Sequence, residues 1–383
     1  MSAPRSRFGL AAASGVALLL AVSACSGGED PRPRIEAGPE DRPERTLEEA
    51  GWDTLFTVGG SVGDTTLLHP VEVAADSAGV SVYDAGRHAI VRFGRNGSLH
   101  WTFGGPGAGP GEFSRVDDLE LDAHGRTWAL DPETARITVV SPTGELVRMV
   151  PLDAVDERAA RVIPLPGGRA VLFLHARRRP LAVVDSTGRV LDRRAFPWDD
   201  FSELPFLATQ VESDRAPGEP AWALAFAMGD GFFGFDSVEE LGYHGWYVEP
   251  IAFPRVVVSR SEEGDRTSTT REITDPEFAA QSVSVADGML AVLFVGKGEH
   301  PRRLLDLYRL KDGRYRASLL LPRAATNVDL ADGIAYATFA HPVPGLTALR
   351  LPEDGLALEP TRGSRADAAP PTGTSREGGV NSP

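Results

Sequence analysis

The chain has 383 residues, of which 42% are hydrophobic and 24% are charged, and its formal net charge is −15. That apolar fraction is enough for a sizeable core, whereas a single cysteine rules out an intramolecular disulfide. Most of the negative charge falls within residues 51–360, without a basic stripe. Because phosphate backbones and anionic membrane surfaces would repel such a body, we expect no nucleic-acid partner.

The first 24 residues have the three parts of a secretory signal peptide. Arg5 and Arg7 supply positive charge, an apolar run covers 8–21, and small residues lead up to Cys25. The apolar run is too short to span a bilayer. A lone cysteine directly after "VSA" resembles the lipobox of bacterial lipoproteins.

That resemblance implies how the protein is anchored. In lipoproteins the cysteine carries a diacylglyceryl group and becomes the acylated N-terminus, so the lipid bilayer would be contacted through acylated Cys25. Ser26 in the next position implies the outer membrane rather than the inner membrane. The alternative is an ordinary signal peptide whose cysteine is incidental. More than one acyl chain would hold the protein stably on the membrane.

Two segments flank the body and differ from it in composition. Residues 25–50 are charged and rich in proline, which predicts a disordered tether. Residues 361–383 form a similar low-complexity stretch and are predicted to be a disordered tail. The folded part is therefore expected over 51–360.

The body carries an internal repeat. Residues 71–98 align with 117–145, pairing Asp84 with Asp131 and Gly97 with Gly144. Each unit reads as strand, strand, strand and glycine turn. Such X-Gly turns recur at Asn96-Gly97, Thr143-Gly144, Thr187-Gly188, Glu263-Gly264, Asp312-Gly313 and Asp354-Gly355. Glycine accepts the positive φ of hairpin turns. Most intervals lie near 45 residues, which predicts four-stranded blades, six in all.

Residues 99–149 resemble an NHL repeat. The matching stretches are "FGGPGAGPGEF", "LELDAHGRTWALD" and "ARITVVSPTGELV". The resemblance is good over about 55–150 and reduces to strand spacing over 150–360. It implies an all-β, six-bladed β-propeller of the NHL or TolB-like kind, in which Asp84 and Asp131 bind the following turn. Arg136 stands at the family's arginine position, but Ala89 departs from it in the first blade.

Propellers must close their ring, because an open one would expose strand edges. The stretch "LFTVGG" at 55–60 is similar to the outer strand at 99–105, so we expect it to complete the last blade. "LALEP" at 356–360 is the competing outer strand. The fourth blade contains inserted material within 213–255, and a seventh blade hidden there is the alternative to six.

Residues 104–111 read "GGPGAGPG", a spacing that also occurs in phosphate-binding loops. No Lys-Ser/Thr follows and no helix pattern begins there, so both structural requirements of such a loop are missing. The stretch follows the outer strand of one blade and precedes the inner strand of the next. We therefore interpret it as a crossover between blades.

The inner strands begin with polar residues, which would ring one mouth of a central channel: Glu72, Asp118, Arg161, Gln210, Ser282 and Asn327. Carboxylate and amide oxygens are ligands for Ca²⁺. Lactonase-like six-bladed propellers, which this pattern is similar to, hold a divalent ion with such residues. Arg161 would repel an ion, and polar residues are also expected wherever a channel mouth is simply wet. His88 is predicted in a loop at this mouth, as a ligand or acid–base group.

The sequence therefore favours a binding module in the cell envelope over an enzyme. We expect it to hold a protein or glycan partner with the loops around one channel mouth. The alternative is a metal-dependent hydrolase or lyase of the lactonase-like kind, and a third possibility is sensing within a transport or secretion assembly. A serine hydrolase lacks support, because no Gly-x-Ser-x-Gly elbow is present.

Overall fold

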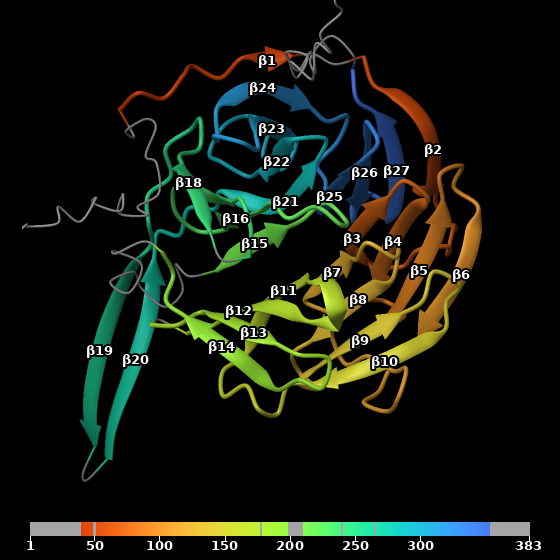
Figure 1. The fold of residues 1–383 in the computed structure, drawn as a ribbon. Coiled ribbons are helices and arrows are strands. Elements are labelled where there is room, and N and C mark those ends of the chain that lie inside the picture. Colours follow the sequence, from red (N-terminus) through yellow and green to blue (C-terminus); the bar gives the residue numbers. More distant parts are fainter. Residues whose placement is uncertain are drawn as a thin grey trace, which may run out of the picture. The chain divides into compact units, whose positions relative to one another are not determined.

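The computed structural model describes residues 40–48, 51–176, 178–197, 210–238, 240–263 and 266–352. These residues form an all-β propeller of six blades (Figure 1). Each blade contains four antiparallel strands, given below from the inner strand to the outer one, and blade 5 has a fifth, parallel strand. Within this described part, the only helix is a 3-10 turn at Pro166–Gly168, and no helix is long and apolar enough to cross a membrane.

The first three blades follow each other in chain order. Blade 1 contains β3 (Pro70–Asp76), β4 (Gly79–Asp84), β5 (Ala89–Gly94) and β6 (Leu99–Gly104). Blade 2 contains β7 (Asp118–Leu121), β8 (Thr127–Asp131), β9 (Arg136–Val140) and β10 (Leu146–Pro151). Blade 3 contains β11 (Ala159–Pro164), β12 (Ala170–Leu174), β13 (Leu181–Val184) and β14 (Val190–Arg194).

The remaining blades include additions to this plan. Blade 4 contains β15 (Val211–Asp214), β16 (Trp222–Phe226), β17 (Phe232–Phe235) and β18 (Leu241–Gly245). Blade 5 contains β21 (Ala280–Ala286), β22 (Met289–Phe294), β23 (Leu304–Arg309) and β24 (Tyr315–Leu320), to which β1 (Leu47–Glu48) adds a fifth strand. Blade 6 contains β25 (Asn327–Ala331), β26 (Ile334–Phe339), β27 (Gly345–Arg350) and β2 (Asp53–Gly59).

The ring is closed by its N-terminal strand, as predicted. β2 pairs antiparallel with β27, from Asp53 opposite Arg350 to Gly59 opposite Gly345. Each inner strand also lies beside the inner strands of both neighbouring blades, all the way round the ring. The competing outer strand at 356–360 lies outside the described residues. The first and last strands of the ring thus share one sheet, which joins the two ends of the propeller and covers the edge of β27.

The hydrophobic core is divided among the interfaces between blades. Successive residues of a strand point to opposite faces of its sheet, so each blade contributes to two interfaces. In β4, Val80 and Val82 pack against blade 6, whereas Tyr83 packs against blade 2. Six such clusters lie around the ring, one between each pair of neighbouring blades. This packing holds the inner strands in fixed register around the axis.

Residues 40–48 correct the predicted extent of the tether, because they are folded against blade 5. β1 pairs in parallel with β24, and Arg45 forms ion pairs with Glu249 at 2.6 Å and Asp306 at 2.7 Å. The Asp306 side chain is fully buried, and a buried carboxylate requires a partner. Arg45, one of the charged residues from which disorder over 25–50 was predicted, is that partner. Residues 25–39 lie outside the described part of the chain.

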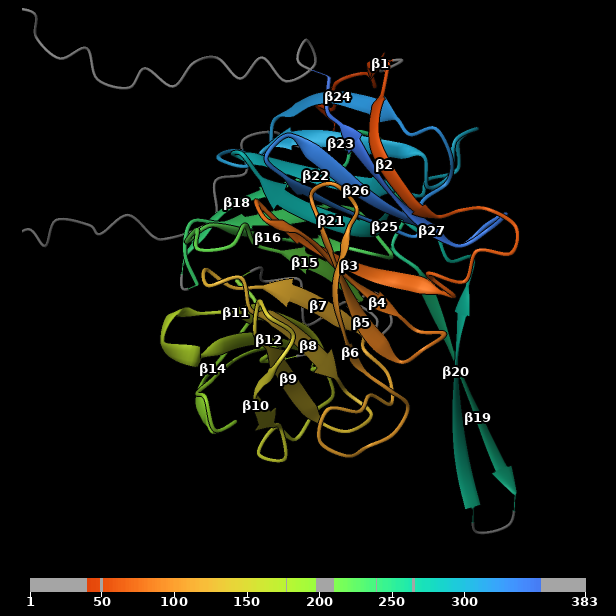
Figure 2. The ribbon, with the colours of Figure 1, turned by 90° about the vertical axis from the view of Figure 1, so that its right-hand side faces the viewer.

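The insertion also differs from the prediction. Residues 213–255 include the strands of blade 4, and the added element is a two-stranded hairpin of β19 (Arg255–Glu263) and β20 (Arg266–Thr274). Figure 2 shows this hairpin projecting from the ring. Glu263 of the predicted Glu263-Gly264 turn is the last residue of β19 and pairs with Arg266, whereas Gly264 lies outside the described residues. Blade 4 makes its outer turn between Asp236 and Glu240, a stretch without glycine that the X-Gly pattern did not predict.

Candidate functional site

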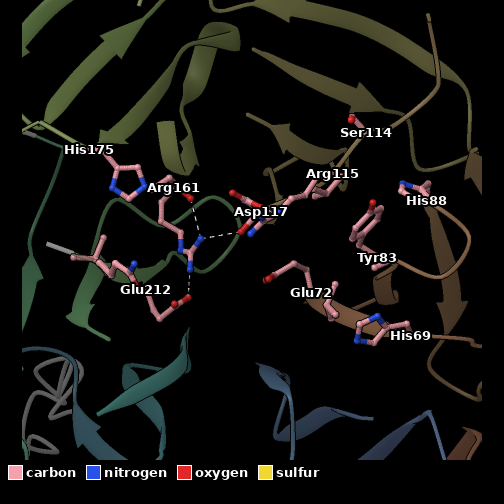
Figure 3. Close-up of a pocket in the computed structure, with 16 residues that line it drawn as sticks. His69, Glu72, Tyr83, His88, Ser114, Arg115, Asp117, Arg161, His175 and Glu212 are labelled. Atoms are coloured by element: carbon pink, nitrogen blue, oxygen red, sulfur yellow. Dashed lines mark hydrogen bonds and ion pairs between the residues drawn. The ribbon is translucent and has the colours of Figure 1, made fainter. Parts of the chain in front are cut away.

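A cavity of about 570 Å³ opens at one mouth of the ring and is the candidate site (Figure 3). Its walls come from blades 1, 3 and 4 and from the segment that leads into β7. The lining residues are His69, Val71, Glu72, Tyr83, Ala85, His88, Ser114–Asp117, Ala160, Arg161, His175 and Gln210–Glu212. Three of the residues that were predicted at the starts of inner strands line this cavity, namely Glu72, Arg161 and Gln210. His88 lines it from the turn between β4 and β5, where we predicted it.

The other members of the predicted ring connect blades rather than line the cavity. The Asp118 carboxylate accepts the Val162 N–H at 2.6 Å, and the Ser282 hydroxyl accepts the Val328 N–H at 3.1 Å. The same arrangement recurs at Asp214, which accepts from Val285, at Ser284, which accepts from Leu330, and at Asp329, which accepts from Ala75.

This repeated bond explains why the inner strands are polar. An inner strand has no neighbouring strand on the side that faces the channel axis. Its N–H groups on that side therefore need another acceptor. A short polar side chain from the preceding blade provides it. Asp118 and Ser282 thus have a structural task, which sequence position alone could not distinguish from ligand binding.

Arg161 also connects blades. Its Nη1 donates to the backbone oxygens of Asp117 and Ala160, both at 2.8 Å, and its Nη2 pairs with the Glu212 carboxylate. Burial opposes its charge, but the nearby carboxylates of Glu212, Asp118 and Glu72 raise its pKa above the ordinary value for arginine. The guanidinium is therefore a fixed, compensated charge that joins blades 2, 3 and 4 in the cavity wall.

Glu72 occupies a different electrostatic position. Its carboxylate accepts the side-chain amide of Asn327 at 2.9 Å, which joins blade 1 to blade 6. Burial raises the pKa of Glu72 well above its ordinary range, Arg161 lowers it, and Glu212 is the largest of the nearby carboxylates that raise it further. The predicted ligand residue Asn327 thus acts by holding Glu72 rather than by lining the cavity itself.

Three histidines line the cavity, of which the sequence singled out one. His88 has a positive φ of 51°, and its Nδ1 is buried without a hydrogen-bond partner among the residues that the structure describes. His69 immediately precedes β3, and His175 follows β12 at the turn that corresponds to that of His88 in blade 1. Burial lowers the pKa of His175, and Arg158 and Arg161 lower it further. Aligning blade 3 on blade 1 at this turn would have found His175.

Asp84 and Asp131 bind the turns expected from the NHL resemblance, and each also places a cavity residue. Asp84 accepts the backbone N–H of His69 at 2.7 Å, and Asp131 accepts that of Ser114 at 2.8 Å. Where Ala89 replaces the family's arginine, Arg87 pairs with Asp84 at 2.7 Å. These contacts hold the rim of the cavity to the second strands of blades 1 and 2.

The glycine-rich stretch is a crossover between blades 1 and 2, as predicted. The Glu112 carboxylate accepts the Gly109 N–H at 2.8 Å, so the loop encloses a carboxylate of its own. Arg136 holds the loop from blade 2 by donating to Ala108 O at 2.7 Å and Gly109 O at 3.0 Å. A Cβ at Gly107 would overlap the Glu112 side chain. The loop therefore shapes the segment that continues into the cavity wall at 114–117.

Two further observations concern the whole channel. A second cavity of about 790 Å³ opens at the opposite mouth, where Asp76, Asp287 and Asp332 contribute to its lining. Nothing in the sequence analysis pointed to it. Among the described residues, no group of three or more His, Cys, Asp or Glu side chains is placed to hold a metal ion.

Comparison with known proteins supports the fold and nothing more specific. No family model and no curated protein matches this chain, so the NHL likeness remains a resemblance. Among solved structures, it is similar to a candidate exported protein of Bacteroides fragilis, with a TM-score of 0.50 at 10% identity, over 81% of this chain and 99% of that one.

Two other solved structures are more loosely similar. One is virginiamycin B lyase from Staphylococcus aureus, with a TM-score of 0.46 at 11% identity, over 75% of this chain and 82% of that one. The other is the Cps50 (Swd1) β-propeller domain from Myceliophteria thermophila, with a TM-score of 0.47 at 10% identity, over 79% of this chain and all of that one. These distant likenesses transfer no activity or partner to this chain.

Proposed function

We propose that this protein is a binding module of the bacterial cell envelope that takes part of a glycan or protein partner into the cavity lined by Glu72, Gln210 and His88. The single observation that carries the proposal is the cavity of about 570 Å³, whose size is typical of small-ligand sites. It fits a sugar residue or one or two amino-acid side chains. The partner's remainder would lie across the surrounding loops.

The cavity is suited to binding because its walls are held in place. Arg161 fixes blades 2, 3 and 4 to each other, and the Asn327–Glu72 hydrogen bond joins blades 1 and 6. A preformed site loses little conformational entropy when its ligand arrives. Gln210 and His88 contribute further polar groups to the cavity that Glu72 lines. Such a mixture suits a hydroxyl-rich or peptide-like ligand, which both donates and accepts hydrogen bonds.

The test is direct binding by the purified full-length chain to arrays of envelope glycans and peptides. Glu72→Gln and Gln210→Ala should each weaken binding about tenfold or more, as expected for a lost hydrogen bond to a charged or polar group. Asp287→Asn, at the opposite mouth, is the matched control and should leave affinity unchanged. Binding that ignores both cavity substitutions would contradict the proposal.

A metal-dependent hydrolase or lyase remains the second candidate. The observation that favours acid–base chemistry is that Glu72, with its raised pKa, shares the cavity with three histidines. The described residues present no group of ligands for the metal, and Asp118 is committed to the Val162 N–H. Binding is therefore the better-supported function.

The location is proposed from the sequence. Cys25 lies outside the described residues; its place after a small-residue cleavage site supports an acylated N-terminus, and Ser26 after it supports the outer membrane. The acidic body would then face its partner in the envelope without binding anionic lipid surfaces.

A further inference from the structure

We infer that the cavity recognises a cationic group, a primary ammonium or a guanidinium, and that Glu72 is its counter-ion. This inference rests on the proposed binding function and names the chemistry of the ligand. The shared feature would be the positive charge, whether it belongs to an amino sugar or to a basic amino-acid side chain.

The charges around the cavity are paired, with one exception. Glu212 pairs with Arg161 across the wall. Asp117 pairs with Arg115 and, at 3.0 Å, with Arg158. Among the described residues, Glu72 is the lining carboxylate without a cationic side chain at ion-pair distance. Its one protein hydrogen bond among these residues comes from the neutral amide of Asn327.

Glu72 is placed to meet a ligand. In Figure 3 its side chain extends from β3 toward the middle of the cavity, on the opposite side from His175. Asn327 engages one carboxylate oxygen, Oε2, and so fixes the orientation of the group. A carboxylate can accept several hydrogen bonds. The group is therefore both held in place and still able to accept from an incoming N–H.

The energetics favour a cation over an anion. Burial raises the pKa of Glu72 because the charged form is poorly solvated there. An incoming positive charge would offset that penalty and stabilise the ionised carboxylate. An anionic ligand would instead face the Glu72 carboxylate, which has no cationic partner among the described residues to offset the repulsion between like charges.

Arg161 does not reverse this preference. Its charge is compensated by Glu212, and both Nη1 hydrogens are used by backbone oxygens. His69 and His88 line the cavity together with Glu72, and the lowered pKa of His175 favours its neutral form. Neutral imidazoles can accept hydrogen bonds from an ammonium group.

The experiment compares charged probes with neutral counterparts of nearly the same shape, using isothermal titration of the full-length protein. Glucosamine is compared with glucose, in which a hydroxyl replaces the ammonium group, and N-acetylarginine amide with N-acetylcitrulline amide. We expect at least one charged probe to bind about tenfold tighter than its neutral counterpart. The first pair reports a sugar source of the charge and the second a peptide source.

The variants assign the preference to Glu72. Glu72→Gln should remove the charge preference while retaining the bond from Asn327, and Glu72→Asp should retain part of it. Asp287→Asn at the opposite mouth should change nothing. Matching melting curves establish that each variant is folded.

The possible failures are distinguishable. If neutral probes bind in the cavity as tightly as charged ones, or if Glu72→Gln keeps the preference, the inference is wrong while the binding function stands. If no probe binds and the envelope arrays also show no Glu72- or Gln210-dependent binding, both proposals fail. If array ligands bind but no charged probe does, the cationic inference alone is overturned.

Discussion

The side-chain amide of Asn327 donates to the Glu72 carboxylate at 2.9 Å, although the two residues are 255 positions apart in the chain. The bond crosses the seam where the last blade meets the first. It therefore couples closure of the ring to the orientation of the one lining carboxylate that lacks an ion-pair partner in the described structure. The same hydrogen bond thus contributes to the stability of the ring and to the shape of the proposed binding site. The predictions below test stability and binding separately.

The first prediction concerns pH. Burial raises the pKa of Asp118 to about 7, and Arg161 and the Val162 N–H only partly oppose this effect. A carboxyl group whose folded pKa exceeds its unfolded value of about 4 binds its proton more tightly in the folded chain. Its contribution to stability is therefore complete below pH 4 and is lost as the pH rises through 7.

Thermal unfolding should report this loss. Between pH 5 and pH 8 the Tm should fall, and Asp118→Asn should reduce that fall by about 3 °C, roughly 1 kcal/mol for a domain of this size. Asp185→Asn is the control, because hydrogen bonds, chiefly from the Thr187 side chain, lower the pKa of Asp185 to about 2. An Asp118 variant that melts with an unchanged pH slope would contradict the assignment.

The second prediction tests the folded segment at 40–48. Arg45→Ala should destabilise the protein by about 3 kcal/mol, because it leaves the fully buried Asp306 carboxylate without its counter-ion. Arg95→Ala removes an exposed ion pair with Asp332 and should change stability by less than about 1 kcal/mol. Chemical denaturation of both variants measures the difference. Equal, small effects would mean that the segment is not held by this pair in solution.

The third prediction separates the binding module from the metal-dependent candidate. If the binding proposal is right, Ca²⁺ or Zn²⁺ added to metal-free protein should leave the Tm unchanged. The metal-dependent alternative requires a rise in Tm that disappears in the double variant Glu72→Gln, Asp118→Asn. Differential scanning calorimetry with and without chelator decides between them, and a Glu72-dependent rise would favour the enzyme.

The fourth prediction concerns the anchor. Cells fed an alkyne-tagged palmitate should label the wild-type protein, and Cys25→Ala should not label, because the chain has no other thiol. The variant should also move from the membrane fraction to the soluble exported fraction. Labelling that survives the substitution would refute the lipobox interpretation.

The general fold could be predicted because its determinants are local and repeated. The paired positions Asp84 and Asp131, with Gly97 and Gly144, mark the same points of two blades, and both glycines have the positive φ that their turns require. The similarity of 55–60 to 99–105 likewise predicted the closing strand. Each of these signals is a short stretch of sequence that recurs along the chain.

The features that were missed depend on partners distant in the chain. In the sequence, Arg45 looks like part of a charged tether. Its partner Asp306 is 261 positions away in the chain, so the ion pair could not be predicted.

A second miss has a local cause. The turn at Asp236–Glu240 contains no glycine, so the spacing of X-Gly turns assigned Glu263-Gly264 to blade 4 instead. At the candidate site, sequence position identified Glu72 and His88 but could not show that Asp118 and Arg161 serve neighbouring blades.

Because β2 and β27 belong to the same sheet, the ring can close only late in folding. Synthesis proceeds from the N-terminus, so residues 53–59 are made early and have no partner strand until residues 345–350 emerge. The propeller therefore cannot close its ring until almost all of the folded body has been synthesised. If synthesis stops before β27, β2 has no partner strand and the ring stays open. Proteases and chaperones could recognise such an intermediate by the unpaired edge of β2.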